Sequence, residues 1–253
     1  MQQIKPKCRL YRGSIAIFDA LGTKALWDKL PAHKLMTLYK SVESKAKRDS
    51  IMSQSIRNTS NGPTLETGFL FFSDTVAIYA FCRDDNAPDE WVQIQTIYDV
   101  VGRTSLLLKE AALNKPPLMY RGSIAYGELL VDPPFYLGNA AIEAARFFEK
   151  AECGCVWLTP DTANIYDSLK NKQPELDECL IKHDIPLKNA PERLDVSEPI
   201  TEPSYAVNLL YAVEQHHRCD VLECLAKSFG ENPTGSQLRK RNNTLDLFNK
   251  LGQ

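Results

Sequence analysis

The segment GFLFFSDTVAIYAF, residues 68–81, constrains the fold of this chain more than any other stretch. Two apolar runs, rich in aromatic and β-branched residues, flank Ser73-Asp74, and this spacing predicts a tight β-hairpin. An apolar strand candidate, SIAIFD, precedes the hairpin at 14–19. Between them leucines recur at helical spacing from about 23 to 47. The chain is therefore expected to begin with a strand, a helix and two further strands.

The pattern after the hairpin extends this order. A helix is expected from Asp89 to about Ala112, before the stop signal Pro116-Pro117, and 118–131 is predicted to form a strand pair bent at Gly127. We then expect a loop at DPPFYLG, a helix over 139–150, a strand at CVWL, a short helix near 161–170, and strands at 178–188 and 204–213. This order matches the ferredoxin-like βαββαβ plan, an α+β fold with an antiparallel sheet.

Composition limits the location and the partners. The 253 residues suffice for one domain, predicted at 12–210, with a C-terminal β/α extension of the same unit at 211–253. A net charge of −2 gives no basic field for nucleic acid, and no apolar run is long enough to cross a membrane. Seven cysteines without paired CxxC motifs favour reduced thiols and a cytoplasmic protein. The helical, polar C-terminal part, which contains KSFGENPTGSQLRKRNNT, is expected to be a solvated tail or an accessory helix pair.

Two aspartates interrupt apolar runs where burying a lone charge is costly: Asp19 ends the first strand, and Asp74 lies at the hairpin tip. The ferredoxin-like plan makes these positions neighbours. Converged carboxylates repel unless a cation separates them, so the pair predicts a Mg²⁺ or Mn²⁺ site with a phosphate substrate. The alternative is a pair of solvated hairpin and cap acids. Gly22 and Thr23 would open a helix whose N–H groups hold phosphate, and Lys24 would add positive charge or be solvated.

Four motifs in order resemble those of the class III nucleotide cyclases, over roughly residues 12–210. FDALGT is similar to the first metal loop of that family. FFSDTVAIYA is similar to the second, with Ser73 in place of the usual glycine. RGSIAYGELL resembles the family's Gly-Ile-x-x-Gly strand. YLGNAAIEAAR resembles the segment in which an arginine follows a glycine by eight residues, which leads from Gly138 to Arg146.

The resemblance implies a homodimeric enzyme with composite active sites and two Mn²⁺ or Mg²⁺ ions per site. Arg146 would cross the dimer interface to neutralise charge on the transition-state phosphate. The implied catalytic residues are Asp19, Asp74 and Arg146, the implied metal ligands are Asp19, Ala20 and Asp74, and the implied substrate contacts are Ala20, Leu21, Gly22, Thr23, Leu70, Phe135 and Asn139.

Departures from the family pattern indicate which nucleotide base the substrate would carry. Leu70 and Phe135 occupy the positions where purine cyclases have a base-reading lysine and acid, and Ile142 occupies that of the transition-state asparagine. The whole pattern is most similar to the Pycsar pyrimidine cyclases of bacterial antiphage defence. It implies conversion of UTP to 3′,5′-cyclic UMP and diphosphate, with the product read by a separate effector protein.

Three alternatives stay open from sequence. CTP differs from UTP at one exocyclic position, so the same chemistry would give cyclic CMP. The missing asparagine at Ile142 favours a catalytically degenerate domain that binds nucleotide and signals by shape. A palm-like nucleotidyl transferase shares the two-aspartate core, but the near-neutral charge disfavours it.

Overall fold

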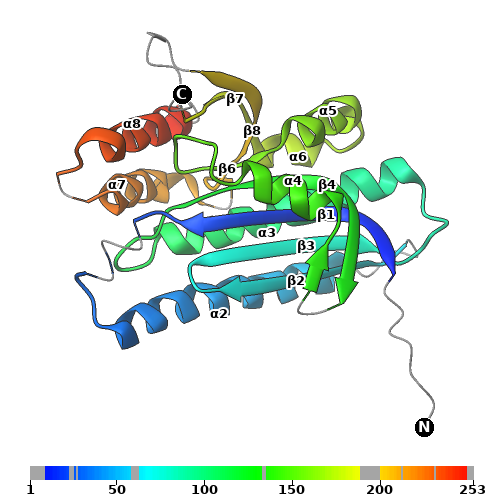
Figure 1. Cartoon of the computed structure of the whole chain (residues 1–253), viewed down its shortest axis with the longest axis horizontal. Helices are drawn as coiled ribbons and strands as arrows, with labels where there is room; N and C mark the ends of the chain where they lie inside the picture. The colour runs from blue at the N-terminus through cyan, green and yellow to red at the C-terminus, as the bar shows by residue number, and fades with distance from the viewer. Residues whose placement is uncertain are drawn as a thin grey trace.

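The computed structural model describes residues 9–22, 26, 28–57, 63–132, 135–188, 200–211, 213–230 and 232–249. Figure 1 shows their elements in chain order. The elements are β1 (Leu10–Ala20), α2 (Ala32–Arg57), β2 (Leu65–Phe72), β3 (Thr75–Cys82), α3 (Asp89–Ala112), β4 (Tyr120–Asp132), β5 (Phe135–Leu137), α4 (Asn139–Phe147), β6 (Val156–Leu158), α5 (Pro160–Leu169), η1 (Lys170–Lys172), α6 (Pro174–Cys179), β7 (Leu180–Pro186), β8 (Thr201–Val207), η2 (Gln215–His217), α7 (Arg218–Ser228) and α8 (Gly235–Asn249).

The strands form one eight-stranded sheet in the order β2-β3-β1-β4-β6-β8-β7, with β5 paired to β4. β1 lies between β3 and β4 and is antiparallel to both, and β2 is antiparallel to β3. The order β4-β1-β3-β2 is that of a ferredoxin-like βαββαβ unit. The predicted α+β class is therefore confirmed, with a mostly antiparallel sheet in which β6 is parallel to β4. β6, β8 and β7 extend the sheet beyond this unit.

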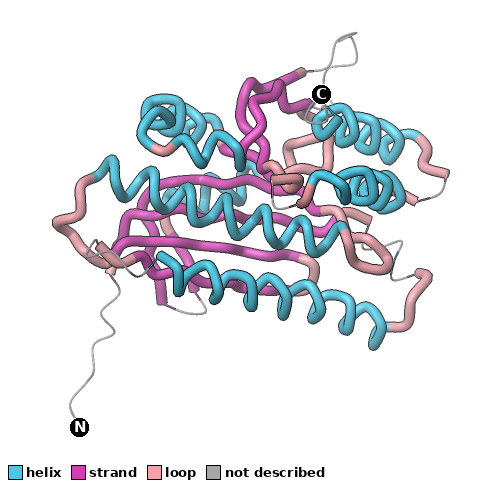
Figure 2. The backbone as a smooth tube through the Cα atoms, turned by 180° about the vertical axis from the view of Figure 1, so that it is seen from behind, coloured by secondary structure: helices cyan, strands magenta, loops and turns pink. Residues whose placement is uncertain are grey.

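Helices cover the two faces of the sheet unequally. α2 and α3 lie across one face, as Figure 2 shows from behind. α4 lies on the other face against β1 and β4, where Ser123 Oγ donates to Ala144 O at 2.7 Å. Because side chains alternate along a strand, β1 sends Phe18 into the α2–α3 side and Ile17 and Asp19 toward the α4 side. The α4 side is the one that carries the candidate site.

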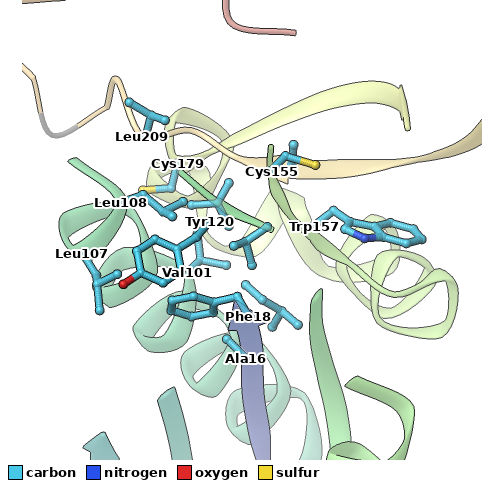
Figure 3. Packing of buried hydrophobic residues seen from close by; sticks show 14 of the residues in the cluster. Ala16, Phe18, Val101, Leu107, Leu108, Tyr120, Cys155, Trp157, Cys179 and Leu209 are labelled. Carbon is cyan, nitrogen blue, oxygen red and sulfur yellow. The ribbon is translucent and has the colours of Figure 1, made fainter. Parts of the chain in front are cut away.

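The main core lies between the sheet and the α2–α3 layer (Figure 3). Phe18 and Tyr120, neighbours on β1 and β4, meet edge to face with ring centroids 5.4 Å apart. Further along the sheet, Trp157 is fully buried and meets Phe147 edge to face at 5.7 Å. Such aromatic pairs contribute about 0.5–1.5 kcal/mol beyond the area they bury. The Phe18–Tyr120 pair packs the end of β1 against β4, one residue before Asp19.

Three predicted details around the central strands differ from the structure. β4 is one continuous strand, and Gly127 does not bend it. A side chain at Gly127 would meet Ala140 N at 3.3 Å, so this glycine allows α4 to approach the strand closely. The expected loop at DPPFYLG contains the short strand β5, and the helix expected over 139–150 ends at Phe147.

The C-terminal segment forms a helix pair, α7 and α8, which is the second of its two expected forms, and not a solvated tail. Leu225 of α7 and Leu247 and Phe248 of α8 are completely buried in the main core. Thr244 Oγ1 accepts a 2.7 Å hydrogen bond from Gly154 N, which anchors α8 beside β6. Burial of Leu247 and Phe248 thus holds the polar residues of α8 that precede them against the rest of the domain. No helix in the described ranges is long and apolar enough to cross a membrane.

Candidate active site

The structure brings Asp19 and Asp74 to one edge of the sheet. Asp19 pairs with Thr75 across β1 and β3, and Ala20 N donates to Asp74 O at 3.1 Å. Asp74 belongs to a two-residue turn whose other member, Ser73, has a φ of 57°. A non-glycine residue with positive φ is uncommon, and such backbone conformations concentrate at functional sites. The predicted convergence of the two aspartates is observed.

Register places a third charged residue beside this pair. Arg121, the second residue of β4, lies opposite Asp19, so both side chains face the α4 side. Arg121 Nη2 is 3.7 Å from Asp19 Oδ2, and the arginine side chain is only 6% exposed. Sequence reasoning missed Arg121. Its signal was an arginine at the start of an otherwise apolar strand, but its partner becomes visible only once the β1–β4 register is known.

Within the described part of the chain, one of the two oxygens of the Asp19 carboxylate lacks the hydrogen-bond partner that a buried charge requires. Burial raises the pKa of Asp19, the Arg121 guanidinium lowers it, and the nearby acids Glu149 and Asp74 raise it again. Among the described residues, neither Asp19 Oδ1 nor Arg121 Nε has a hydrogen-bond partner, although both atoms are buried. The unpaired oxygen of Asp19, which lies near other acids, suits a divalent cation as its partner. The unpaired Nε–H of Arg121 suits an anion.

Positive charge gathers on the same side. Burial lowers the pKa of Lys188, the nearby positive charges of Arg121 and Lys240 lower it further, and Glu149 and Asp19 counteract them. Lys188 follows β7, and its backbone N–H donates to Lys150 O at 2.9 Å. Lysine and arginine side chains beside a carboxylate pair form an electrostatic environment suited to a metal-bound polyphosphate.

The pKa of Asp19 leads to a prediction for the metal-free protein. The folded state holds the Asp19 proton more tightly than the unfolded chain, because its pKa lies above the ordinary 3.8. Stability is therefore lost as pH rises from the unfolded pKa through the folded one. Asp19→Asn should remove this loss and give a higher urea midpoint than wild type at pH 7. The difference should vanish near pH 3, where both states are protonated.

The matched control for that measurement is Asp184→Asn, at an exposed position on β7. It should follow the wild-type pH dependence. Mn²⁺ should raise the melting temperature of wild type and of the control, because a ligand that binds only the folded state stabilises it. The same ion should leave Asp19→Asn unchanged. A lower urea midpoint for metal-free Asp19→Asn at pH 7 would contradict the electrostatic account of this site.

The loop after β1 is fixed at its beginning. Leu21 N donates to Met119 O at 2.7 Å, and Gly22 has a φ of +79°, which favours glycine. Gly22 O accepts from Leu26 N at 3.2 Å. Thr23 and Lys24, for which phosphate contacts were predicted, lie outside the described residues.

An apolar strip lies beside the carboxylates on the α4 side of the sheet. Leu70 pairs with Ala77, and Ala77 pairs with Ile17, so these three form a row adjacent to that of Asp19. All three are half-buried, and neighbouring Phe72 is 77% exposed. The predicted substrate contact Leu70 therefore lies near Asp19. Phe135 lies in β5, and its side chain is outside the described part of the structure.

The α4 residues of the prediction form an exposed stripe. Asn139, Ile142 and Arg146 recur at helical spacing and are all exposed, Ile142 to 66%. Gly138 packs against Glu128 O, which places Asn139 beside the Glu128–Arg12 pair of β4 and β1. Seven residues of β1 separate Arg12 from Asp19, a span of about 24 Å. One protomer therefore does not bring Asn139 to the two aspartates.

Comparisons with known proteins find solved structures that are similar to this chain. No family model and no curated protein matches it. The chain is similar to the adenylyl cyclase CyaB from P. aeruginosa, at 14% identity and a TM-score of 0.47, over 80% of this chain and 96% of that one. The guanylyl cyclase Cya2 matches at 12% identity and a TM-score of 0.47, over 79% of this chain and 93% of that one.

Proposed function

We propose that the protein is a nucleotide cyclase that converts UTP to 3′,5′-cyclic UMP and diphosphate. The observation that carries this proposal is the convergence of Asp19 and Asp74 at one sheet edge, with Asp19 Oδ1 buried and without a partner among the described residues. These two carboxylates, together with the backbone of Ala20, would hold Mn²⁺ or Mg²⁺. When bound, the ions would lower the pKa of the attacking hydroxyl and neutralise charge on the phosphates.

The reaction forms one bond and breaks one. The ribose 3′-oxygen attacks the α-phosphorus, the bond from that phosphorus to the β-bridging oxygen breaks, and diphosphate leaves while the hydroxyl proton passes to solvent. Arg121 and Lys188 supply positive charge beside Asp19, and Arg121 Nε is a buried donor with no described partner. Such a donor suits a phosphate oxygen. The positive charges support a triphosphate as substrate.

A second copy of the chain completes the proposed site. Arg146 would act on the α-phosphate held by the partner subunit, as the resemblance to the class III cyclases implies, and its exposed side chain is available to a second chain. Exposed apolar side chains support burial of this face: Leu137 is 59%, Ile142 66% and Phe72 77% exposed. In a two-fold dimer the same contacts occur twice and give two equivalent composite sites.

The base assignment rests on the apolar strip. Leu70 offers apolar contact and no hydrogen bond, and the resemblance gives Phe135 the same role. A purine would leave ring polar atoms unpaired, at about 1–3 kcal/mol for each buried unsatisfied group. That penalty corresponds to roughly tenfold to hundredfold discrimination per group. We therefore propose UTP as substrate and CTP as nearest competitor, with cyclic UMP as an antiviral second messenger read by a separate effector.

The test is a competition of UTP, CTP, ATP and GTP at equal concentrations with Mn²⁺, with products identified by mass spectrometry. Cyclic UMP should dominate, followed by cyclic CMP. Cyclic AMP or cyclic GMP as main product would overturn the base assignment, and cyclic CMP as main product would select the cytidylate alternative. Nucleotide that binds but stays intact would select the alternative of a catalytically degenerate regulator. The observation that favours this alternative is Ile142, an exposed apolar residue at the position of the family's transition-state asparagine.

A further inference from the structure

A cavity of about 970 Å³ lies where the C-terminal helices meet the loop after β1. One wall is the β1–α2 connection, which contributes Leu21, Gly22 and Leu30. A second is the Pro116-Pro117 turn before β4. The third runs from Lys227 through the α7–α8 connection to Lys240 of α8. The volume is at the upper end of the roughly 300–1,000 Å³ typical of small-molecule sites.

The chemistry of the lining is that of a site for an organic anion. Three lysines, Lys29, Lys227 and Lys240, contribute to it, and no acid does among the described lining residues. Lys227 is held in place by Glu223 at 2.6 Å, and Glu223 is not part of the lining. Leu21 and the buried Phe229, with the leucines and prolines around them, supply an apolar floor. Charged heads around apolar walls suit a ligand with an acidic group on an apolar body.

The third wall is rigidly held. Besides the Thr244 hydrogen bond to Gly154, Asn243 Nδ2 donates to Glu152 O at 2.8 Å, and Arg239 Nε is 3.2 Å from Glu152 Oε1. α8 is thus fixed to the segment before β6. In turn, Gly122 N donates to Cys155 O at 3.0 Å, one residue along β4 from Arg121. The α8 wall of the cavity is therefore held in place. A ligand bound in the cavity would contact this wall on one side and the loop after β1 on the other.

The cavity and the candidate active site share a short piece of backbone. Leu21 and Gly22 line the cavity and lie two and three residues after Asp19. We propose that this cavity binds a small organic anion with an apolar body, and that its occupancy further restrains the Leu21–Gly22 backbone and thereby regulates the cyclase. The regulatory part rests on the proposed function. The binding part and the ordering of the loop do not.

Binding is tested with the probe 1-anilinonaphthalene-8-sulfonate, a sulfonate on an aromatic body whose fluorescence rises in apolar sites. The double variant Lys29→Ala/Lys227→Ala should weaken its affinity by about three- to tenfold, because two of the three cationic partners are lost. Both side chains are outside the core, and Lys40→Ala on α2 is the matched control, expected to bind like wild type. Equal affinity for the double variant and wild type would overturn the assignment.

Two further arms separate this cavity from the substrate site and test the coupling. Diphosphate and UTP should leave most of the probe bound, because the cavity, among its described lining residues, shares only Leu21 and Gly22 with the implied substrate contacts. Full displacement would make the cavity part of the substrate site instead. Hydrogen exchange of the peptide that contains Leu21 and Gly22 should slow severalfold on probe binding in wild type but not in the double variant. No change would overturn the coupling, whether or not the protein turns over nucleotides. With cyclisation established by the nucleotide competition, the probe should change its rate at least twofold, and an unchanged rate would overturn regulation alone.

Discussion

Replacement of Asp19 or Asp74 by alanine is expected to lower nucleotide cyclisation by a factor on the order of 10³, about 4 kcal/mol of transition-state stabilisation. Each carboxylate would share the same cations, so neither alone would hold them near the phosphates. Both variants should remain folded, since Asp19 is a buried acid whose charge is opposed by its surroundings and Asp74 lies in a turn. Initial rates with UTP and Mn²⁺ provide the measurement.

The control for this pair is Asp184→Ala, which removes an exposed acid from β7 and should keep the wild-type rate. Because the aspartates are proposed to act on the same ions, the double variant should be scarcely worse than either single variant. Retention of more than about a tenth of wild-type turnover by Asp19→Ala or Asp74→Ala would refute the two-metal assignment. Loss of the circular dichroism spectrum would indicate a folding effect and call for the asparagine variants.

The order of elements and the aspartate pair were predictable because both depend on local pattern. Ser73-Asp74 between two apolar runs can only be a tight turn, and an acid that ends an apolar strand marks its edge. The ferredoxin-like order then places the hairpin beside the first strand, which brings Asp19 to Asp74. These steps use sequence periodicity and one topological rule, with no knowledge of side-chain contacts.

The remaining charges of the site were not predictable in this way. Arg121 meets Asp19 only because β1 and β4 pair in one register, and a slip of one residue would turn it to the other face. Glu149 and Lys188 reach the same region from the end of α4 and from beyond β7, through packing between distant segments. The cavity described above is lined in part by α8. The buried residues that hold α8 in the core, Leu247 and Phe248, follow a long polar run, so the sequence pattern does not indicate their burial.

Arg146→Ala is expected to lower turnover by a factor on the order of 10²–10³ with little change in substrate affinity, the usual loss for one transition-state donor. Arg146 is exposed, and its guanidinium carbon lies 5.8 Å from the Phe147 ring centroid in its own chain. Removal should therefore cost little stability. The measurement is kcat and KM for UTP, with Lys40→Ala, which removes an exposed cation from α2, as the control.

Subunit mixing tests whether Arg146 acts across the dimer. A mixed dimer of Asp74→Ala and Arg146→Ala chains would contain one site with both defects and one with neither. Mixing two nearly inactive proteins should then restore up to about one quarter of wild-type turnover per chain, because random exchange makes half of the dimers mixed and gives each one intact site. Mixing Asp74→Ala with Asp19→Ala should restore nothing, since every site in that dimer lacks one aspartate. Equal, negligible activity in both mixtures, with subunit exchange shown by mass spectrometry, would mean that each protomer works with its own residues.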